Sequence, residues 1–188
     1  MSQNAQEAGT AIADVLFGDY NPAGRLVVTW PQSVDQLPSM LDYNLRHGRT
    51  YMYFKGEPLY PFGYGLSYTT FRYANLKTSA SSMPRNGENM VSVDVENTGE
   101  KAGDEIVQLY VRHEASKVTR PVKELRGFQR VSLQPHQTKT VRMKLKADSL
   151  SYWDERAGHF VVEEEPVRIL VGGSSADTQL ETIVKIAQ

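Results

Sequence analysis

The sequence predicts a mainly β protein, in which a two-sheet antiparallel β-sandwich follows a helix–strand remnant of an α/β domain and an aromatic linker. From Phe71 onward, short runs that alternate apolar and polar residues are separated by turn clusters, and this spacing is typical of a sandwich of the immunoglobulin type. Before Phe71 the pattern is first helical and then irregular and aromatic. We therefore divide the chain into residues 1–31, 32–67 and 68–188, and call 32–67 the linker.

The composition is that of an ordinary globular protein. Of 188 residues, 40% are hydrophobic and 23% are charged, and the net charge is -1. This balance gives no electrostatic argument for nucleic acid or an anionic membrane as a partner. Cysteine is absent, which excludes disulfides and thiolate chemistry. No apolar stretch is long enough to span a bilayer, and the first residues lack the pattern of a secretion signal.

The first segment is half of an α/β unit. Within residues 5–17, apolar residues recur at a helical spacing, and Gly18 is a suitable C-cap. An Asn-Pro turn leads to residues 25–30, RLVVTW, which predict a short strand. Such a unit buries its apolar face only against neighbouring strands, and this chain supplies none. We expect residues 1–30 either to pack back on the sandwich or to mediate self-association of two copies.

The last segment carries the expected core and several further predictions. Gly127 marks a bulge, Tyr152 and Trp153 are expected in the core, and residues 163–165 read as an exposed strand end. The side chains expected on inward faces are Val93, Val95, Val107, Leu109, Val111, Val141, Met143, Leu145, Ile169 and Val171.

Three stretches carry a resemblance to a known family. Residues 60–71, YPFGYGLSYTTF, resemble the junction between the α/β-sandwich domain and the C-terminal fibronectin type III-like domain of glycoside hydrolase family 3 enzymes. Upstream, the pattern made by Gly18, Asn21, Pro22, Gly24, Arg25 and Leu26 resembles the end of that α/β domain. Downstream, VENTGEKAGDEIVQLYV, RPVKELRGFQRVSL and LSYWDERAGHFVVEEEPVRILVGGSS resemble the fibronectin type III-like domain. The resemblance therefore implies the C-terminal portion of a β-glucosidase or β-xylosidase.

The resemblance also implies which chemistry this chain lacks. A retaining enzyme of this family has an Asp nucleophile in an N-terminal barrel and an acid/base carboxylate in the second domain. Neither residue matches a position here, so we assign no catalytic residue, cofactor or metal ligand, and we expect no hydrolysis by this chain alone. The implied partners are the barrel and α/β domains of the parent enzyme. For that enzyme, a bacterial periplasmic or secreted location is expected.

The linker offers a candidate for sugar contact. Arg49, Tyr51, Tyr53 and Phe54 combine aromatic faces with hydrogen-bonding groups, which suit the apolar faces and polar rims of an oligo- or polysaccharide. The alternative is an aromatic strap packed over another domain, with Arg46 and Arg49 paired to carboxylates. Solvent-facing, coplanar rings would favour the first reading and packed rings the second. A carbohydrate-binding or self-associating module is accordingly the alternative to a domain-docking role.

Overall fold

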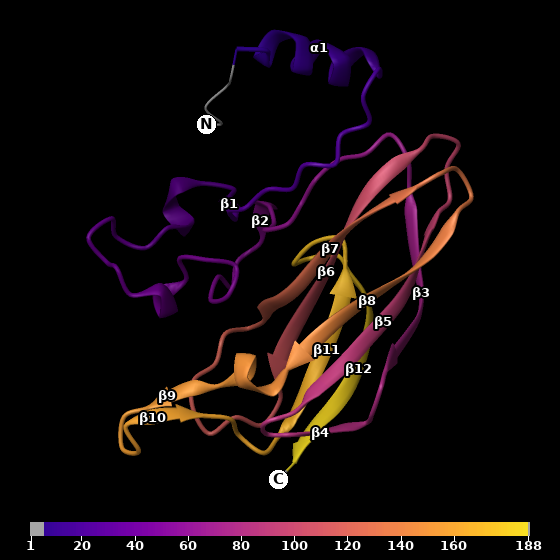
Figure 1. Ribbon diagram of the computed structural model, residues 1–188. Helices are drawn as coiled ribbons and strands as arrows, with labels where there is room; N and C mark the ends of the chain where they lie inside the picture. The colour runs from indigo at the N-terminus through magenta and orange to yellow at the C-terminus, as the bar shows by residue number, and fades with distance from the viewer. Residues whose placement is uncertain (1–5, 188) are drawn as a thin grey trace.

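The computed structural model describes residues 6–187 and confirms the predicted fold class (Figure 1). Between residues 6 and 67 the structure has one α-helix, α1 (Ala8–Phe17), two short 3-10 helices (Val34–Gln36 and Leu45–His47), and a small antiparallel pair, β1 (Trp30–Pro31) with β2 (Pro58–Tyr60). The helix ends as predicted at Gly18, whose φ of 86° lies in the left-handed region that glycine adopts without strain.

Two sheets form the sandwich. The larger sheet has the order β4-β12-β11-β6-β7 and the smaller one β3-β5-β8. Neighbours run antiparallel except β4, which lies parallel to β12 at the edge. The bounds are β3 Phe71–Thr78, β4 Ser82–Pro84, β5 Glu88–Asn97, β6 Gly103–His113, β7 Glu124–Leu133, β8 Thr138–Lys146, β11 Pro166–Gly172 and β12 Thr178–Ala187.

A hairpin projects from the sandwich between β8 and β11. After a 3-10 turn (Ala147–Leu150), β9 (Tyr152–Asp154) pairs with β10 (His159–Val161) as a separate two-stranded ribbon. In Figure 1 this hairpin and the linker extend from the same side of the sandwich.

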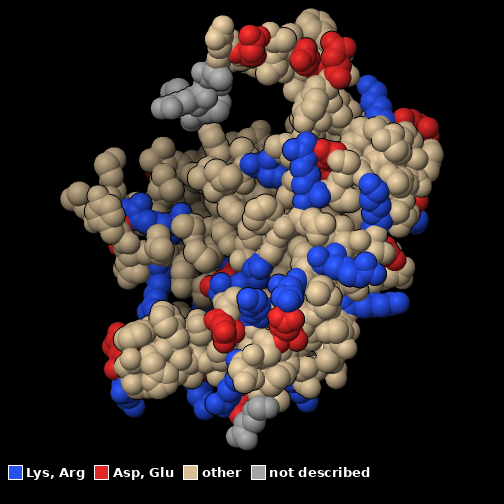
Figure 2. Space-filling model, in the orientation of Figure 1, with Lys and Arg blue, Asp and Glu red and all other residues tan. Residues whose placement is uncertain are grey.

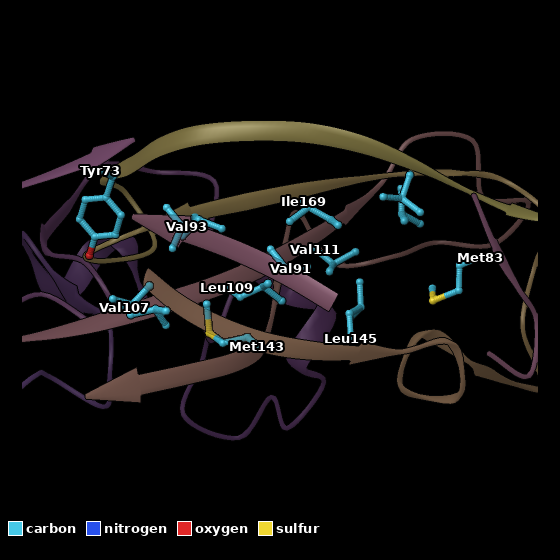
Figure 3. Close-up of a cluster of buried hydrophobic side chains, with 14 of the residues drawn as sticks. Tyr73, Met83, Val91, Val93, Val107, Leu109, Val111, Met143, Leu145 and Ile169 are labelled. Carbon is cyan, nitrogen blue, oxygen red and sulfur yellow. The ribbon is translucent and has the colours of Figure 1, made fainter. Parts of the chain in front are cut away.

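The core lies between the two sheets, as Figure 3 shows. All ten side chains predicted to be buried are buried, which confirms the period-2 reading of the strands. The bulge predicted at Gly127 is also present. Leu109 pairs with Gly127 whereas Tyr110 pairs with Leu125, so that Arg126 is the extra residue.

Residues 25–30 do not form the predicted strand. Apart from Trp30, which begins β1, they have no strand partner in the described structure. Strand formation needs neighbouring strands, and here only Leu26 finds a backbone partner: its N–H donates to the Tyr64 carbonyl, and its carbonyl accepts from the Gly63 N–H, both at 2.8 Å. The predicted strand is therefore replaced by an extended segment held by the linker.

Two predictions about the end of the sandwich are wrong. Trp153 is 53% exposed and Tyr152 is only half-buried, because their strand belongs to the projecting hairpin and not to either main sheet. Conversely, residues 163–165 lie in a loop and not at a strand end, and of the three only Glu164 is exposed. Glu165 is buried and Glu163 half-buried, since both carboxylates have partners in the loop 114–123.

Replacing Leu109 by alanine tests the core. Leu109 is fully buried in β6, so Leu109→Ala should lower the free energy of unfolding by about 2–5 kcal/mol, through lost burial and the cavity left behind. Ile183→Ala, on the half-exposed face of β12, should change it by only about 0.5 kcal/mol. Urea denaturation measures both, and equal losses would contradict this core.

Candidate functional site

The linker covers the outer face of β6 in the larger sheet. On that face Gln108 and Tyr110 are buried although they point away from the core. The Gln108 side-chain amide donates to the carbonyls of Gly63, at 3.1 Å, and of Gly173, while its oxygen accepts from the Tyr110 hydroxyl at 2.6 Å. A Cβ at Gly63 would collide with the Gln108 side chain, so the junction needs glycine there. The linker is thus a third layer on the sandwich.

Tyr51 anchors this layer. Its ring stacks on Phe62 at 4.3 Å between centroids and meets the edge of Tyr110 at 6.0 Å. Its hydroxyl accepts a hydrogen bond from the Leu125 N–H at 2.9 Å, and burial raises the pKa of this phenol. Next to it, the Val122 N–H donates to the Met52 carbonyl at 2.7 Å. The linker is therefore joined to both β6 and β7.

A buried ion pair joins the N-terminal segment to the sandwich. The Arg25 guanidinium donates to one carboxylate oxygen of Glu105 at 2.7 Å, and the Tyr73 hydroxyl donates to the other at 2.7 Å. The side chains of Arg25 and Glu105 are 12% and 5% exposed. Burial raises the pKa of Glu105, and the hydrogen bond from Tyr73 and the charge of Arg25 oppose this rise. Arg25 is thus required to keep this carboxylate paired.

Asn21 makes a second connection from the same turn. Its side-chain amide donates to the Ala102 carbonyl at 2.9 Å, and its oxygen accepts from the Tyr68 N–H at 2.8 Å. The pattern that includes Asn21 and Arg25 therefore has a physical role, because both residues bind the turn to the sandwich, and Asn21 also accepts from the hydroxyl of Ser67 in the linker at 3.0 Å.

Two glutamates, which follow β10 in the sequence, hold the loop 114–123 in place. Glu165 accepts from the Ala115 N–H at 2.9 Å and lies 2.6 Å from the Nδ1 atom of buried His113. Glu163 accepts from the Lys117 N–H at 2.8 Å and pairs with Arg120 at 3.0 Å. Since Val122 in this loop binds the linker, these glutamates support the junction indirectly.

Two of the four residues predicted to contact sugar, Arg49 and Tyr51, have other partners in this structure. Arg49 donates to backbone carbonyls of residues 39–42, including that of Ser39 at 2.6 Å, and so closes its own loop. Tyr51 is packed as described above, and Tyr53 and Phe54 are half-buried. They are not a solvent-facing coplanar set. The alternative interpretation expected Arg49 to pair with a carboxylate. In the structure its hydrogen-bond partners are backbone carbonyls instead.

Among the hollows at the junction, two have linings that bear on function. A cleft of about 370 Å³ is lined by Arg25, Glu105, Tyr73 and Asp177, but Glu105 is already occupied by Arg25 and Tyr73. A wider, mostly apolar groove of about 590 Å³ is lined by Val15, Leu26, Trp30, Tyr60 and Leu66. Among residues 6–187 there is no group of three His, Asp or Glu side chains that could hold a metal ion.

Outside the groove, the segment before the sandwich exposes many large apolar side chains. None of the residues of α1 is buried, and Leu16, Phe17, Val27, Met40, Leu41 and Tyr43 are among the most exposed large apolar side chains. Next to the groove, which Val15 of α1 and Leu26 line, Leu16, Phe17 and Val27 leave apolar surface exposed, and exposed apolar surface of this kind marks an interaction site. The junction therefore has one face that binds the sandwich and another that is free in this chain.

Comparison with known proteins agrees with this arrangement. Residues 1–68 match the family model of the glycosyl hydrolase family 3 C-terminal domain, and residues 105–175 match that of the fibronectin type III-like domain. The chain belongs to glycoside hydrolase family 3, as a C-terminal portion. It is 44% identical over 178 residues to the xylan 1,4-beta-xylosidase of Xylanibacter ruminicola, covering 95% of this chain and 20% of that protein. It is 40% identical over 182 residues to the periplasmic beta-glucosidase of Salmonella typhimurium, covering 90% and 24%.

Solved structures of the family have the same fold. The beta-D-glucoside glucohydrolase of Trichoderma reesei matches with a TM-score of 0.87 and 34% identity, covering 97% of this chain and 29% of that one. The GH3 beta-glucosidase of Bifidobacterium adolescentis matches with a TM-score of 0.88 and 30% identity, covering 96% and 28%. The chain spans only 20–26% of the length of the curated relatives. Within residues 6–187, no helix is long and apolar enough to cross a membrane.

Sequence reasoning assigned no role to Glu105, Gln108, His113 or Glu165, all of which hold the junction or its supporting loop. A usable signal existed for Gln108. The run IVQLYV in β6 is apolar at both alternating sets of positions, which is typical of a strand covered on both faces. The partners of Glu105 and Glu165 had no such signal, because Arg25 lies 80 residues from Glu105 and His113 lies 52 residues from Glu165.

Removing Arg25 tests the buried ion pair. Arg25→Ala leaves the Glu105 carboxylate buried without its cation, so the free energy of unfolding should fall by about 3–5 kcal/mol at neutral pH. Arg72→Ala breaks an exposed pair with Glu96 and should cost about 1 kcal/mol at most.

The same variant has a pH signature. Because the pKa of Glu105 is raised, protonation removes the unpaired charge, and the loss caused by Arg25→Ala should shrink as the pH falls through that pKa. The double variant Arg25→Ala/Glu105→Gln should recover most of the loss at neutral pH. Denaturation at several pH values measures this, and a pH-independent loss would rule out the assigned role of Glu105.

Replacing Tyr51 by phenylalanine tests the linker anchor. Tyr51→Phe keeps the stack on Phe62 but leaves the Leu125 N–H without its acceptor, so stability should fall by about 1–3 kcal/mol. Limited proteolysis should cut the linker faster in this variant. Tyr53→Phe is the matched control, since the Tyr53 hydroxyl has no hydrogen-bond partner among the described residues; if both variants behave alike, the anchor is misassigned.

Proposed function

We propose that this chain serves as the docking C-terminal portion of a family 3 β-glycosidase and performs no catalysis itself. In that enzyme it would hold the sandwich against the barrel and α/β domains, which we call the catalytic body. The observation that carries this proposal is the two-sided junction. One side is fixed to the sandwich through Arg25 and Gln108. The other side presents the exposed face of α1 and the apolar groove.

The exposed helix α1 supports the proposal that the catalytic body packs against that free side. A ten-residue helix is too short to be stable in water by itself and depends on packing of its apolar face. Ile12 and Leu16 lie on that face and are 53% and 71% exposed. Burying each such side chain is worth about 1.5–3 kcal/mol. The barrel and α/β domains of a family 3 enzyme are the partner that we propose for this surface.

The proposed reaction of the complete enzyme is hydrolysis of terminal β-D-xylosyl or β-D-glucosyl residues. The names of the relatives, a xylan 1,4-beta-xylosidase and several beta-glucosidases, support this substrate class. Both carboxyl groups that a retaining mechanism needs would come from the catalytic body. The name of the Salmonella typhimurium relative supports a periplasmic location, which we propose for this protein or, alternatively, secretion.

Two finer points stay predictions. Sugar contact by Arg49, Tyr51, Tyr53 and Phe54 would require the Arg49 guanidinium and the Tyr51 ring to leave the partners described above. Self-association through residues 1–30 would use the same apolar surface as the catalytic body. Light scattering on the isolated chain distinguishes the second point, because a dimer that is lost on removal of α1 would favour self-association.

A chimera tests the proposed function. The C-terminal portion of the Xylanibacter ruminicola enzyme would be replaced by this chain over the 178 aligned residues. We expect β-xylosidase activity within about tenfold of that relative, because catalysis depends on residues outside this portion, whereas the isolated chain should show no turnover. Leu16→Glu, on the exposed face of α1, should impair the chimera but not the fold of the isolated chain, and Arg72→Ala is the control. An unaffected Leu16→Glu chimera would contradict docking through this face.

A further inference from the structure

The β9–β10 hairpin leaves two large aromatic side chains in water. Trp153 and Phe160 are direct cross-strand partners, with ring centroids 5.3 Å apart at 76°. They are 53% and 67% exposed. A two-stranded ribbon is marginally stable by itself, and the pair contributes little core burial to the sandwich. Paired aromatic side chains at the end of a projecting element are typical anchors of a protein interface.

Residue contacts connect this hairpin to the junction. The Arg120 guanidinium lies over the ring of Tyr152, 4.8 Å from its centroid. Arg120 belongs to the loop 114–123, and in the same loop Val122 binds the linker backbone at Met52. The linker, the loop and the hairpin therefore form a continuous series, and Figure 1 shows the first and last of them projecting from the same side.

The series also carries exposed apolar side chains between the linker and the hairpin. Val118 and Val122, in the loop, are 36% and 41% exposed. Figure 2 shows mostly uncharged surface over the linker and the hairpin, with a cluster of charged residues between them. By contrast, the outer face of the β3-β5-β8 sheet carries cross-strand ion pairs, such as Lys144 with Glu88 at 2.9 Å and Arg72 with Glu96. One side of the sandwich is thus suited to a partner and the opposite face to water.

We propose that the β9–β10 hairpin is a second docking point for the same catalytic body, with Trp153 and Phe160 as its anchors. This inference rests on the proposed function. The occupant follows from continuity and from size: the hairpin extends the surface of the linker, and the chain spans only 20–26% of its relatives, so the remainder is large enough to reach both points. One contact allows the sandwich to pivot about the junction. A second contact fixes its orientation.

Hydrogen exchange in the chimera tests this inference against the isolated chain. Amides of the hairpin, residues 152–161, should exchange at least about tenfold more slowly in the chimera than in the isolated chain. Trp153→Ala and Phe160→Ala should each restore fast exchange there and lower the unfolding temperature of the chimera. In the isolated chain the same substitutions should leave the unfolding temperature nearly unchanged, because both rings are exposed. Met90→Ala, on the outer face of β5, is the matched control.

The outcomes separate the two proposals. Slow exchange in the linker of the chimera with unchanged exchange in the hairpin would overturn the second docking point and leave the proposed function standing. Unchanged exchange in both segments of an active chimera would overturn both. Protection of the hairpin in the isolated chain, either by dimerisation or by added xylo-oligosaccharide, would overturn the assignment of the catalytic body as the partner. The partner would then be a second copy of the chain or a sugar. A chimera on the Salmonella typhimurium enzyme provides a second host should the first not fold.

Discussion

The structure depends most on the need to pair the buried carboxylate of Glu105. An ionised carboxylate in this position is tolerated only when both oxygens have partners. One partner, Tyr73, belongs to the sandwich, but the other, Arg25, belongs to the N-terminal segment. The N-terminal turn therefore cannot leave the sandwich without exposing or stranding a charge. This single requirement ties the turn that contains Arg25 to a domain that lies 80 residues away in the sequence, and a boundary placed after residue 30 would remove Arg25.

The linker depends on a second requirement of the same kind. Gln108 and Tyr110 are buried on the outer face of β6, where a two-layer sandwich would leave them in water. The linker supplies one acceptor for the Gln108 amide, the Gly63 carbonyl, and covers Tyr110 with the Tyr51 ring, while Gly173 and the Gln108–Tyr110 hydrogen bond satisfy the remaining polar atoms. The sandwich and linker accordingly form one packed unit, so the sequence boundary at residue 68 separates two patterns of residues and not two independent structures.

The sequence predicted the parts of this fold that depend on local periodicity. Alternation in β5, β6, β8 and β11 identified all ten expected core side chains, because a strand between two sheets must bury every second residue. It failed where tertiary partners decide. Residues 25–30 look like a strand, but a strand needs neighbours, and residues 163–165 look solvated until the loop 114–123 supplies their donors. Trp153 looks like core because its hairpin could not be distinguished from a strand of the main sheets.

The same partners explain how the two ends of the docking surface can act together. Glu163 and Glu165 lie between β10 and β11, and their bonds to the loop 114–123 hold it beside the hairpin. That loop in turn binds the linker at Met52. The hairpin could therefore move independently of the linker only if the charge-assisted hydrogen bonds around Glu165 were broken. Elements that are packed and paired in this way move together. A partner that binds Trp153 and Phe160 of the hairpin would therefore also restrain the linker, although neither residue contacts the linker directly.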